Sequence, residues 1–292
     1  MAHECEGAGE AAAVLYQRGG RWGLPSADPF CLKAQVYCRM AGLELEVVDC
    51  NNAGMSPRGV LPVLQTGSSW TAEEDLLDAL ETQCARPLDG HLSEEQRAEA
   101  FAFERLVEGP LHAAALHAAW AEPANFASVT RPAEADALPF PLGHFLPRLQ
   151  QHAVAARLHA AGLHDAAAAR AAADACYRAL AARLGAKPFF FGPRPSRLDA
   201  VVFGHLAVHY FAPMPAHGLR DLIAQHRNLQ AYVTRLAGEY FEAVPSIKAA
   251  EADVSKDSRE VTETMQRLAV VAAFGILGLF VVRQIRVGTL TV

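Results

Sequence analysis

The sequence predicts an α+β protein with two folded parts, a sheet-and-helix domain at residues 11–87 and an all-helical domain at residues 92–242, followed by a C-terminal transmembrane helix. Three observations lead to this prediction. Strand and helix signals alternate in the first part, strand signals are almost absent from the second, and an apolar run of 15 residues, Leu268 to Val282, lies near the end of the chain. A chain of 292 residues is long enough for two modest domains.

The composition bears on partners and compartment. The chain carries 26 Lys and Arg against 32 Asp and Glu, a net charge of −6, which argues against nucleic acid as a partner. Its six cysteines include no C-x-x-C pair, so reduced, cytosol-facing thiols are expected. Residues 1–10, expected to be flexible, hold three Glu and no Arg, which is the opposite of an Arg-rich mitochondrial presequence.

The first domain opens with a strand signal at residues 11–16 and a glycine-rich turn. Ser26 or Asp28 is placed to cap the helix that follows, because side-chain oxygens accept the free N–H groups of a first turn, and Pro29 fits that first turn. Residues 43–48 then alternate apolar and acidic residues, as a half-exposed strand does. The pattern therefore predicts β-α-β.

A loop at residues 51–57 leads to a second set of signals. We expect a strand after Pro62, a short strand at Trp70–Thr71 and a helix at residues 73–82. The complete order resembles the thioredoxin-like layout of a glutathione-transferase N-terminal domain. In that fold a cis proline begins the third strand, and Leu61–Pro62 occupies that place; the alternative is an ordinary proline on an edge strand.

The second domain consists of helix signals. Ser93 and Gln96 form a capping-box pattern, and alanine-rich runs favour helix intrinsically. The helices are expected near residues 93–106, 111–120, 142–161, 165–184, 198–209 and 225–240.

Ser196 and Asp199 give the sharpest local signal. Their S-x-x-D spacing is the acidic form of a capping box, and an apolar run follows from Ala200 to Leu206. Glutathione-transferase C-terminal domains carry such a box on their most buried helix. We therefore expect a structural role for both residues, the alternative being an ordinary exposed cap.

The C-terminal run has no polar side chain, and Arg267, Arg283 and Arg286 flank it. Its length of roughly 22 Å is short of the roughly 30 Å hydrocarbon core, but flanking arginines reach the interfaces. We predict a transmembrane tail anchor at residues 267–283, preceded by a charged linker at 243–266 and followed by a short tail at 284–292. The alternative is a buried core helix.

Several segments resemble the metaxin family. They are Trp22–Ser26, Met55–Pro62, Pro139–Leu142 and above all Phe190–Leu206, within a similarity that spans residues 14–242. The resemblance implies a glutathione-transferase-like fold at the mitochondrial outer membrane, with the bulk of the chain facing the cytosol. It also implies a role in the import, sorting and assembly of outer-membrane β-barrel proteins. The implied partners are other import and assembly subunits, a second metaxin, precursor proteins and the lipid bilayer.

The competing class is a glutathione-dependent transferase. Such a site needs a hydroxyl or thiol near the start of the first helix, for which Ser26 and Cys31 are candidates. It also needs a serine at the start of the helix after the fourth strand, where this chain has Glu73–Glu74. A second carboxylate there would repel an anionic ligand. A third possibility is an accessory structural subunit of another mitochondrial membrane complex.

Other chemistry has little support in the sequence. His205 and His209 have the i, i+4 spacing of a zinc helix but lack the intervening Glu of that motif. Cys31 and Cys38 are seven residues apart, which favours core positions over a redox pair. We therefore predict no catalytic residues, no metal and no cofactor, and a non-catalytic function.

Overall fold

The computed structural model describes residues 13–50, 53, 56, 59–72, 75–84, 87–136, 138, 142–216 and 218–241. The predicted flexible N-terminus, charged linker, tail anchor with Arg267, Arg283 and Arg286, and short tail lie outside the described residues. Among the helices of the described ranges, none combines the length and apolarity that a membrane span requires.

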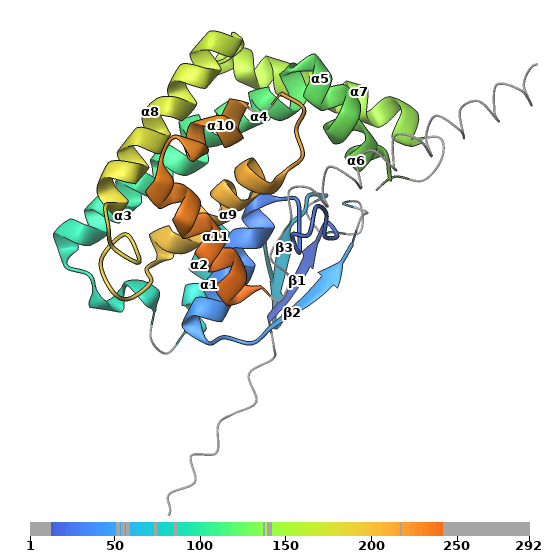
Figure 1. Ribbon diagram of the computed structural model, residues 1–292. Helices are drawn as coiled ribbons and strands as arrows, with labels where there is room; N and C mark the ends of the chain where they lie inside the picture. The colour runs from blue at the N-terminus through green and yellow to red at the C-terminus, as the bar shows by residue number, and fades with distance from the viewer. Residues whose placement is uncertain are drawn as a thin grey trace, which may run out of the picture. The chain divides into compact units, whose positions relative to one another are not determined.

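A four-stranded sheet forms the first part (Figure 1). Its strands are β1 (Ala13–Gln17), β2 (Leu45–Asp49), β3 (Val63–Thr66) and β4 (Ser69–Ala72), in the order β2-β1-β3-β4. β1 pairs in parallel with β2 and antiparallel with β3, and β4 is antiparallel to β3. This mixed topology agrees with the predicted order of signals, although β2 begins two residues later than predicted.

The helix α1 (Pro29–Ala41) makes the crossover between the two parallel strands. Asp28 caps it, accepting hydrogen bonds from the N–H groups of Phe30 and Cys31 at 2.7 and 3.3 Å. Gly42 ends it in the left-handed conformation, at φ 69°. The Leu61–Pro62 peptide bond before β3 is cis, the isomer that the resemblance implies. After β4, the short helix α2 (Leu76–Glu81) completes the first part.

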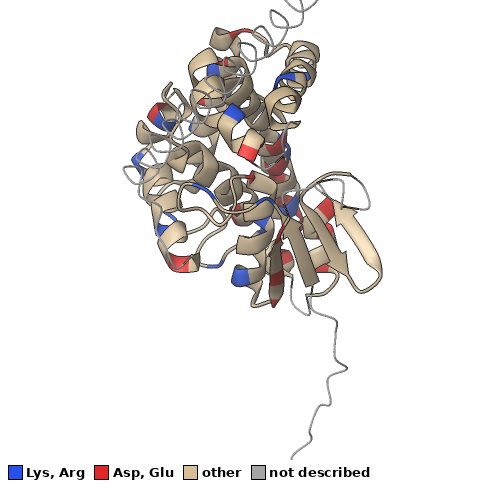
Figure 2. Ribbon diagram, turned by 90° about the vertical axis from the view of Figure 1, so that its right-hand side faces the viewer, with Lys and Arg blue, Asp and Glu red and all other residues tan. Residues whose placement is uncertain are grey.

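Helices form the second part (Figure 1). They are η3 (Leu88–His91), α3 (Glu94–Leu106), η4 (Val107–Leu111), α4 (His112–Leu116), η5 (His117–Ala121), α5 (Pro123–Asn125), η6 (Phe126–Thr130), α6 (Arg131–Asp136), α7 (Leu142–Ala160), α8 (Ala166–Leu184), α9 (Arg197–Phe211), α10 (Gly218–Ala224) and α11 (Arg227–Tyr240). Basic and acidic positions are interspersed over both parts (Figure 2).

The predicted helix at residues 111–120 is less regular than expected. The segments η4, η5 and η6 are wide π-type turns that interrupt the α-helical path. Pro110 lies in the first of them, where it has no N–H to donate and disturbs the ladder of hydrogen bonds. The helices α5, α6 and α10 were not predicted, because helices this short give no clear periodic signal.

The two parts share one apolar core, with α1 on the sheet side and α9 on the helical side. In α9, the residues from Leu198 to Ala207 are all buried. Gly204 lets the helices approach closely, because a Cβ there would lie 2.6 Å from the carbonyl oxygen of Pro29 and 2.8 Å from the backbone nitrogen of Lys33. The sheet part is therefore fixed to the helical part by direct helix–helix packing.

Candidate functional site

A cavity of about 530 Å³ opens where the two parts meet. The start of α1 and Leu61 line it from the sheet part, and α4, η5, α7 and the end of α9 line it from the helical part. Its walls combine small apolar side chains with a few polar ones, among them Arg18, Glu108, His112, Gln150, Arg157 and Arg220. This combination is typical of a binding pocket.

Two ion pairs join the parts at one side of this cavity. Arg18, just after β1, pairs with Glu134 of α6, and both residues line the cavity. Arg21 pairs with Asp136 of the same helix at 3.0 Å. These contacts tie the loop between β1 and α1 to α6, so the cavity has a fixed wall on this side.

Three histidines lie together beside the cavity, and two of them, His112 and His209, line it. His112, His205 and His209 form edge-to-face contacts, and the Phe30 ring packs against the first two. Burial lowers the pKa of His112 to about 4 and that of His209 to about 3, and it holds the pKa of His205 well below its usual range. All three rings are therefore neutral near pH 7.

The spacing of His205 and His209 does not produce a metal site: among the described residues, no three or more His, Cys, Asp or Glu side chains are arranged so that they could hold a metal ion. His209 instead lies with its Nδ1 atom 2.9 Å from the Tyr177 hydroxyl. His205 is fully buried against its aromatic neighbours. Both side chains belong to the packed core.

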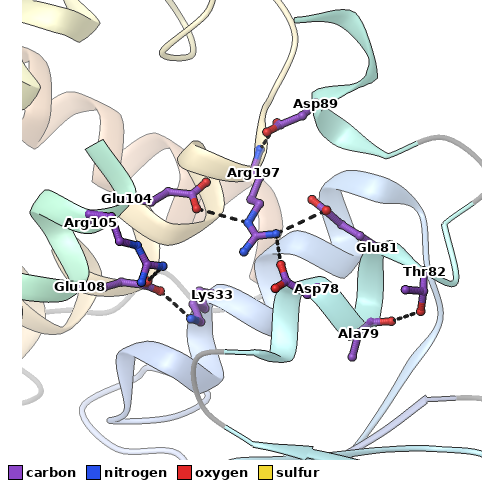
Figure 3. A network of polar contacts seen from close by, with 10 residues as sticks. All are labelled: Lys33, Asp78, Ala79, Glu81, Thr82, Asp89, Glu104, Arg105, Glu108 and Arg197. Atoms are coloured by element: carbon purple, nitrogen blue, oxygen red, sulfur yellow. Dashed lines mark hydrogen bonds and ion pairs between the residues drawn. The ribbon is translucent and has the colours of Figure 1, made fainter. Parts of the chain in front are cut away.

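A buried ion pair joins α1 to η4, and one of its members, Glu108, lines the cavity (Figure 3). Lys33 of α1 is 1% exposed, and its Nζ atom lies 2.6 Å from the carboxylate of Glu108 in η4. Arg105 pairs with the other oxygen of Glu108 at 2.7 Å. Because an unpaired charge in this position would be costly, each member requires the other. Sequence reasoning missed this pair, since its members are far apart in the chain.

Arg197 forms a second link between the parts (Figure 3). Its guanidinium group pairs with Asp78 and Glu81 of α2 and with Glu104 of α3, and its backbone N–H donates to Asp89 at 2.7 Å. Burial raises the pKa of Glu104 to about 7, although Arg197 acts in the opposite direction. Arg197 therefore holds carboxylates from both parts around one cation.

The candidate nucleophiles at the start of α1 do not face the cavity. Ser26 is fully buried, and its hydroxyl donates to the carbonyl oxygen of Arg18 at 3.1 Å. Cys31 is also fully buried, and burial together with the Asp28 carboxylate raises the pKa of its thiol well above the usual range. A protonated, inaccessible thiol is a poor nucleophile. Glu73 and Glu74 lie outside the described residues.

The residues predicted to be structural lie in two places. Leu61, the partner of Pro62 in the cis bond, lines the cavity. Ser196 and Asp199 form a capping box at the start of α9 and are not among the cavity-lining residues. The Ser196 N–H and hydroxyl both donate to one carboxylate oxygen of Asp199, at 2.9 and 2.6 Å.

A sheet part with a cis proline before β3, packed on a helical part with a buried capped helix, defines the glutathione-transferase-like class of fold. Solved structures agree: a rice glutathione transferase in complex with glutathione covers 87% of this chain and 99% of its own, with a TM-score of 0.54 and 18% identity. A glutathione transferase from Methylobacterium radiotolerans, in complex with glutathione sulfonate, covers 80% and 95%, with a TM-score of 0.52 and 16% identity. At such low identity the likeness concerns the fold alone.

Sequence comparison is more specific. Residues 31–151 match the family model described as outer mitochondrial membrane transport complex protein, and residues 173–236 match the glutathione S-transferase C-terminal domain. Metaxin-1 of Mus musculus is 35% identical over 241 residues, which is 79% of this chain and 76% of the relative. Metaxin-2 of Homo sapiens is 31% identical over 79% of this chain and 89% of the relative. The chain belongs to the metaxin family.

Proposed function

We propose that this protein is a non-catalytic subunit of the mitochondrial outer membrane that acts in the import, sorting and assembly of outer-membrane β-barrel proteins. The observation that carries the proposal is the similarity to metaxins over most of the chain, together with the match to the outer mitochondrial membrane transport family. Other import and assembly subunits, a second metaxin and precursor proteins are the proposed partners.

The start of α1 supports a non-catalytic role. In a transferase, a hydroxyl or thiol at this point stabilises the reacting thiolate. Here the Ser26 hydroxyl is used in a buried hydrogen bond, and the Cys31 thiol is inaccessible. The cavity then serves as a surface on which another protein can dock, since a fold can retain a groove after losing the chemistry.

The membrane attachment belongs to the same proposal. The apolar run from Leu268 to Val282, with Arg267, Arg283 and Arg286 beside it, would anchor the chain and leave the folded part on the cytosolic side. The charged linker at residues 243–266 would separate the folded part from the bilayer.

Purification of the intact chain after gentle detergent extraction tests the partners. Co-purification with import subunits and a second metaxin is the expected result. Recovery with the subunits of a different mitochondrial complex would favour the accessory-subunit alternative instead.

A glutathione-affinity column with a conjugation assay tests the competing enzyme. We expect the chain to pass through the column and to show no turnover with an electrophilic substrate. Tight retention together with turnover would overturn the non-catalytic assignment. A functional glutathione transferase of the same fold, run in parallel, shows that the column and the assay work.

A further inference from the structure

The helix α7 has two apolar faces. One face, which includes Gly143, Pro147 and Leu158, is buried. A Cβ on Gly143 would lie 2.7 Å from the carbonyl oxygen of Ala135 in α6, so the two helices approach closely there. This face attaches α7 to the rest of the helical part.

The other face is a second apolar stripe that no described residue covers. Leu142, Phe145 and Leu149 are 45%, 70% and 65% exposed, and the last two are the most exposed large hydrophobic side chains among the described residues. Their spacing of three and four residues places them on one side of the helix. The exposed alanines that continue the same spacing extend the stripe: Ala153, Ala156 and Ala160.

The charge on this helix is of one sign. From Leu142 to His164 the sequence has no Asp or Glu, although the whole chain carries a net charge of −6. The charged side chains of α7 are Arg148 and Arg157; its histidines, formally neutral at pH 7, are His144, His152 and His159. The acidic residues of the neighbouring helix α6, Glu134 and Asp136, are paired with arginines that follow β1.

We propose that the α7 stripe (Leu142, Phe145, Leu149, Ala153, Ala156 and Ala160) lies on an anionic phospholipid surface, as a lipid contact separate from the tail anchor. An exposed Phe and Leu edge beside Arg148 and without carboxylates has the chemistry of an interfacial helix, which inserts apolar side chains at the level of the headgroups. The inference rests on the proposed membrane location. This contact would orient the folded part against the bilayer, which attachment at a single segment cannot do.

Tryptophan quenching in vesicles tests the contact on the full-length chain. Phe145→Trp puts an indole on the stripe, and Phe101→Trp is a matched control because Phe101 is 62% exposed but lies on α3. Each variant is reconstituted into phosphatidylcholine vesicles with phosphatidylinositol, with and without brominated acyl chains. Because interfacial side chains reach roughly 5–10 Å below the surface, bromine should remove most of the emission added by F145W. The emission added by F101W should not change.

Co-flotation of the chain with the vesicles is measured in the same samples. The contact is supported if the bound chain shows quenching of F145W and if adding Arg148→Glu weakens that quenching. Bound chain without quenching of F145W, or with equal quenching of both variants, overturns the contact but not the tail anchor. An indole that is shielded from water but not quenched also overturns it, because a second copy of the chain would then cover the stripe. If the chain does not float with the vesicles, both the proposed tail anchor and the proposed α7 contact are wrong.

Discussion

The carboxylate of Asp199 accepts four hydrogen bonds in the described part of the core. One oxygen accepts from the Phe190 N–H and the Tyr232 hydroxyl, each at 3.0 Å, and the other accepts from both donors of Ser196. Burial raises the pKa of Asp199, and these hydrogen bonds oppose that shift. One side chain thus joins the loop before α9, the start of α9 and the helix α11.

We expect Asp199→Ala to destabilise the protein by about 3 kcal/mol, because it leaves several buried donors without a hydrogen-bond acceptor. Asp165→Ala is a matched control, since Asp165 caps α8 at an exposed position and its loss should cost about 1 kcal/mol. Thermal unfolding followed by circular dichroism measures both. Equal losses in the two variants would mean that Asp199 is an ordinary cap.

The neutral His209 predicts a pH effect on stability. Its folded pKa of about 3 lies below the unfolded value of about 6.5, so the unfolded chain binds more protons at acidic pH. Stability contributed by the neutral ring is therefore present above pH 6.5 and is lost as the pH falls. Glu104, with a raised folded pKa of about 7, works in the opposite direction, because its folded form takes up a proton first.

A difference measurement isolates His209 from the other groups. The free energy of unfolding falls between pH 8 and pH 5 in the natural chain. In His209→Gln this fall should be smaller by about 2 kcal/mol, because the variant has no imidazole to protonate. Denaturant titrations at the two pH values provide the comparison. Parallel losses in both proteins would show that protonation of His209 does not contribute.

At the scale of elements, the contact between α1 and α9 depends on the absence of a side chain. Gly204→Ala would press a methyl group against the backbone of α1, and we expect a cost of about 1–3 kcal/mol. Gly109→Ala is the control, because a Cβ there meets nothing within 4 Å, and it should be neutral or stabilise by up to about 1 kcal/mol. If G204A leaves the melting temperature unchanged, the helices do not pack as tightly as described.

The elements that the sequence predicts best are those whose signals are local. Asp28 with Pro29, Ser93 with Gln96, and the S-x-x-D box of α9 each mark a helix start within a few residues. The pairing of Lys33 with Glu108 has no such signal, because its members meet only when α1 packs on the helical part. The exposed stripe of α7 could not be predicted either. The sequence predicts the helix, but only the packing of the fold shows which side of it is left uncovered.

At the scale of the whole molecule, the proposed function gives the folded part and the proposed anchor separate roles. Packing between α1 and α9 and the ion pairs of Arg18 and Arg197 hold the sheet and helical parts as one body. That body presents a defined surface, and the proposed anchor would keep it at the membrane. The function we propose therefore requires both the folded part and the segment that follows it.

The most direct test is the assembly of a radiolabelled β-barrel precursor in mitochondria depleted of this protein. We predict that the amount of protease-resistant, membrane-integrated barrel falls, that the full-length chain restores it, and that a chain without residues 267–292 folds but does not restore it. Unchanged barrel assembly after depletion, or full rescue by the shortened chain, would contradict the account.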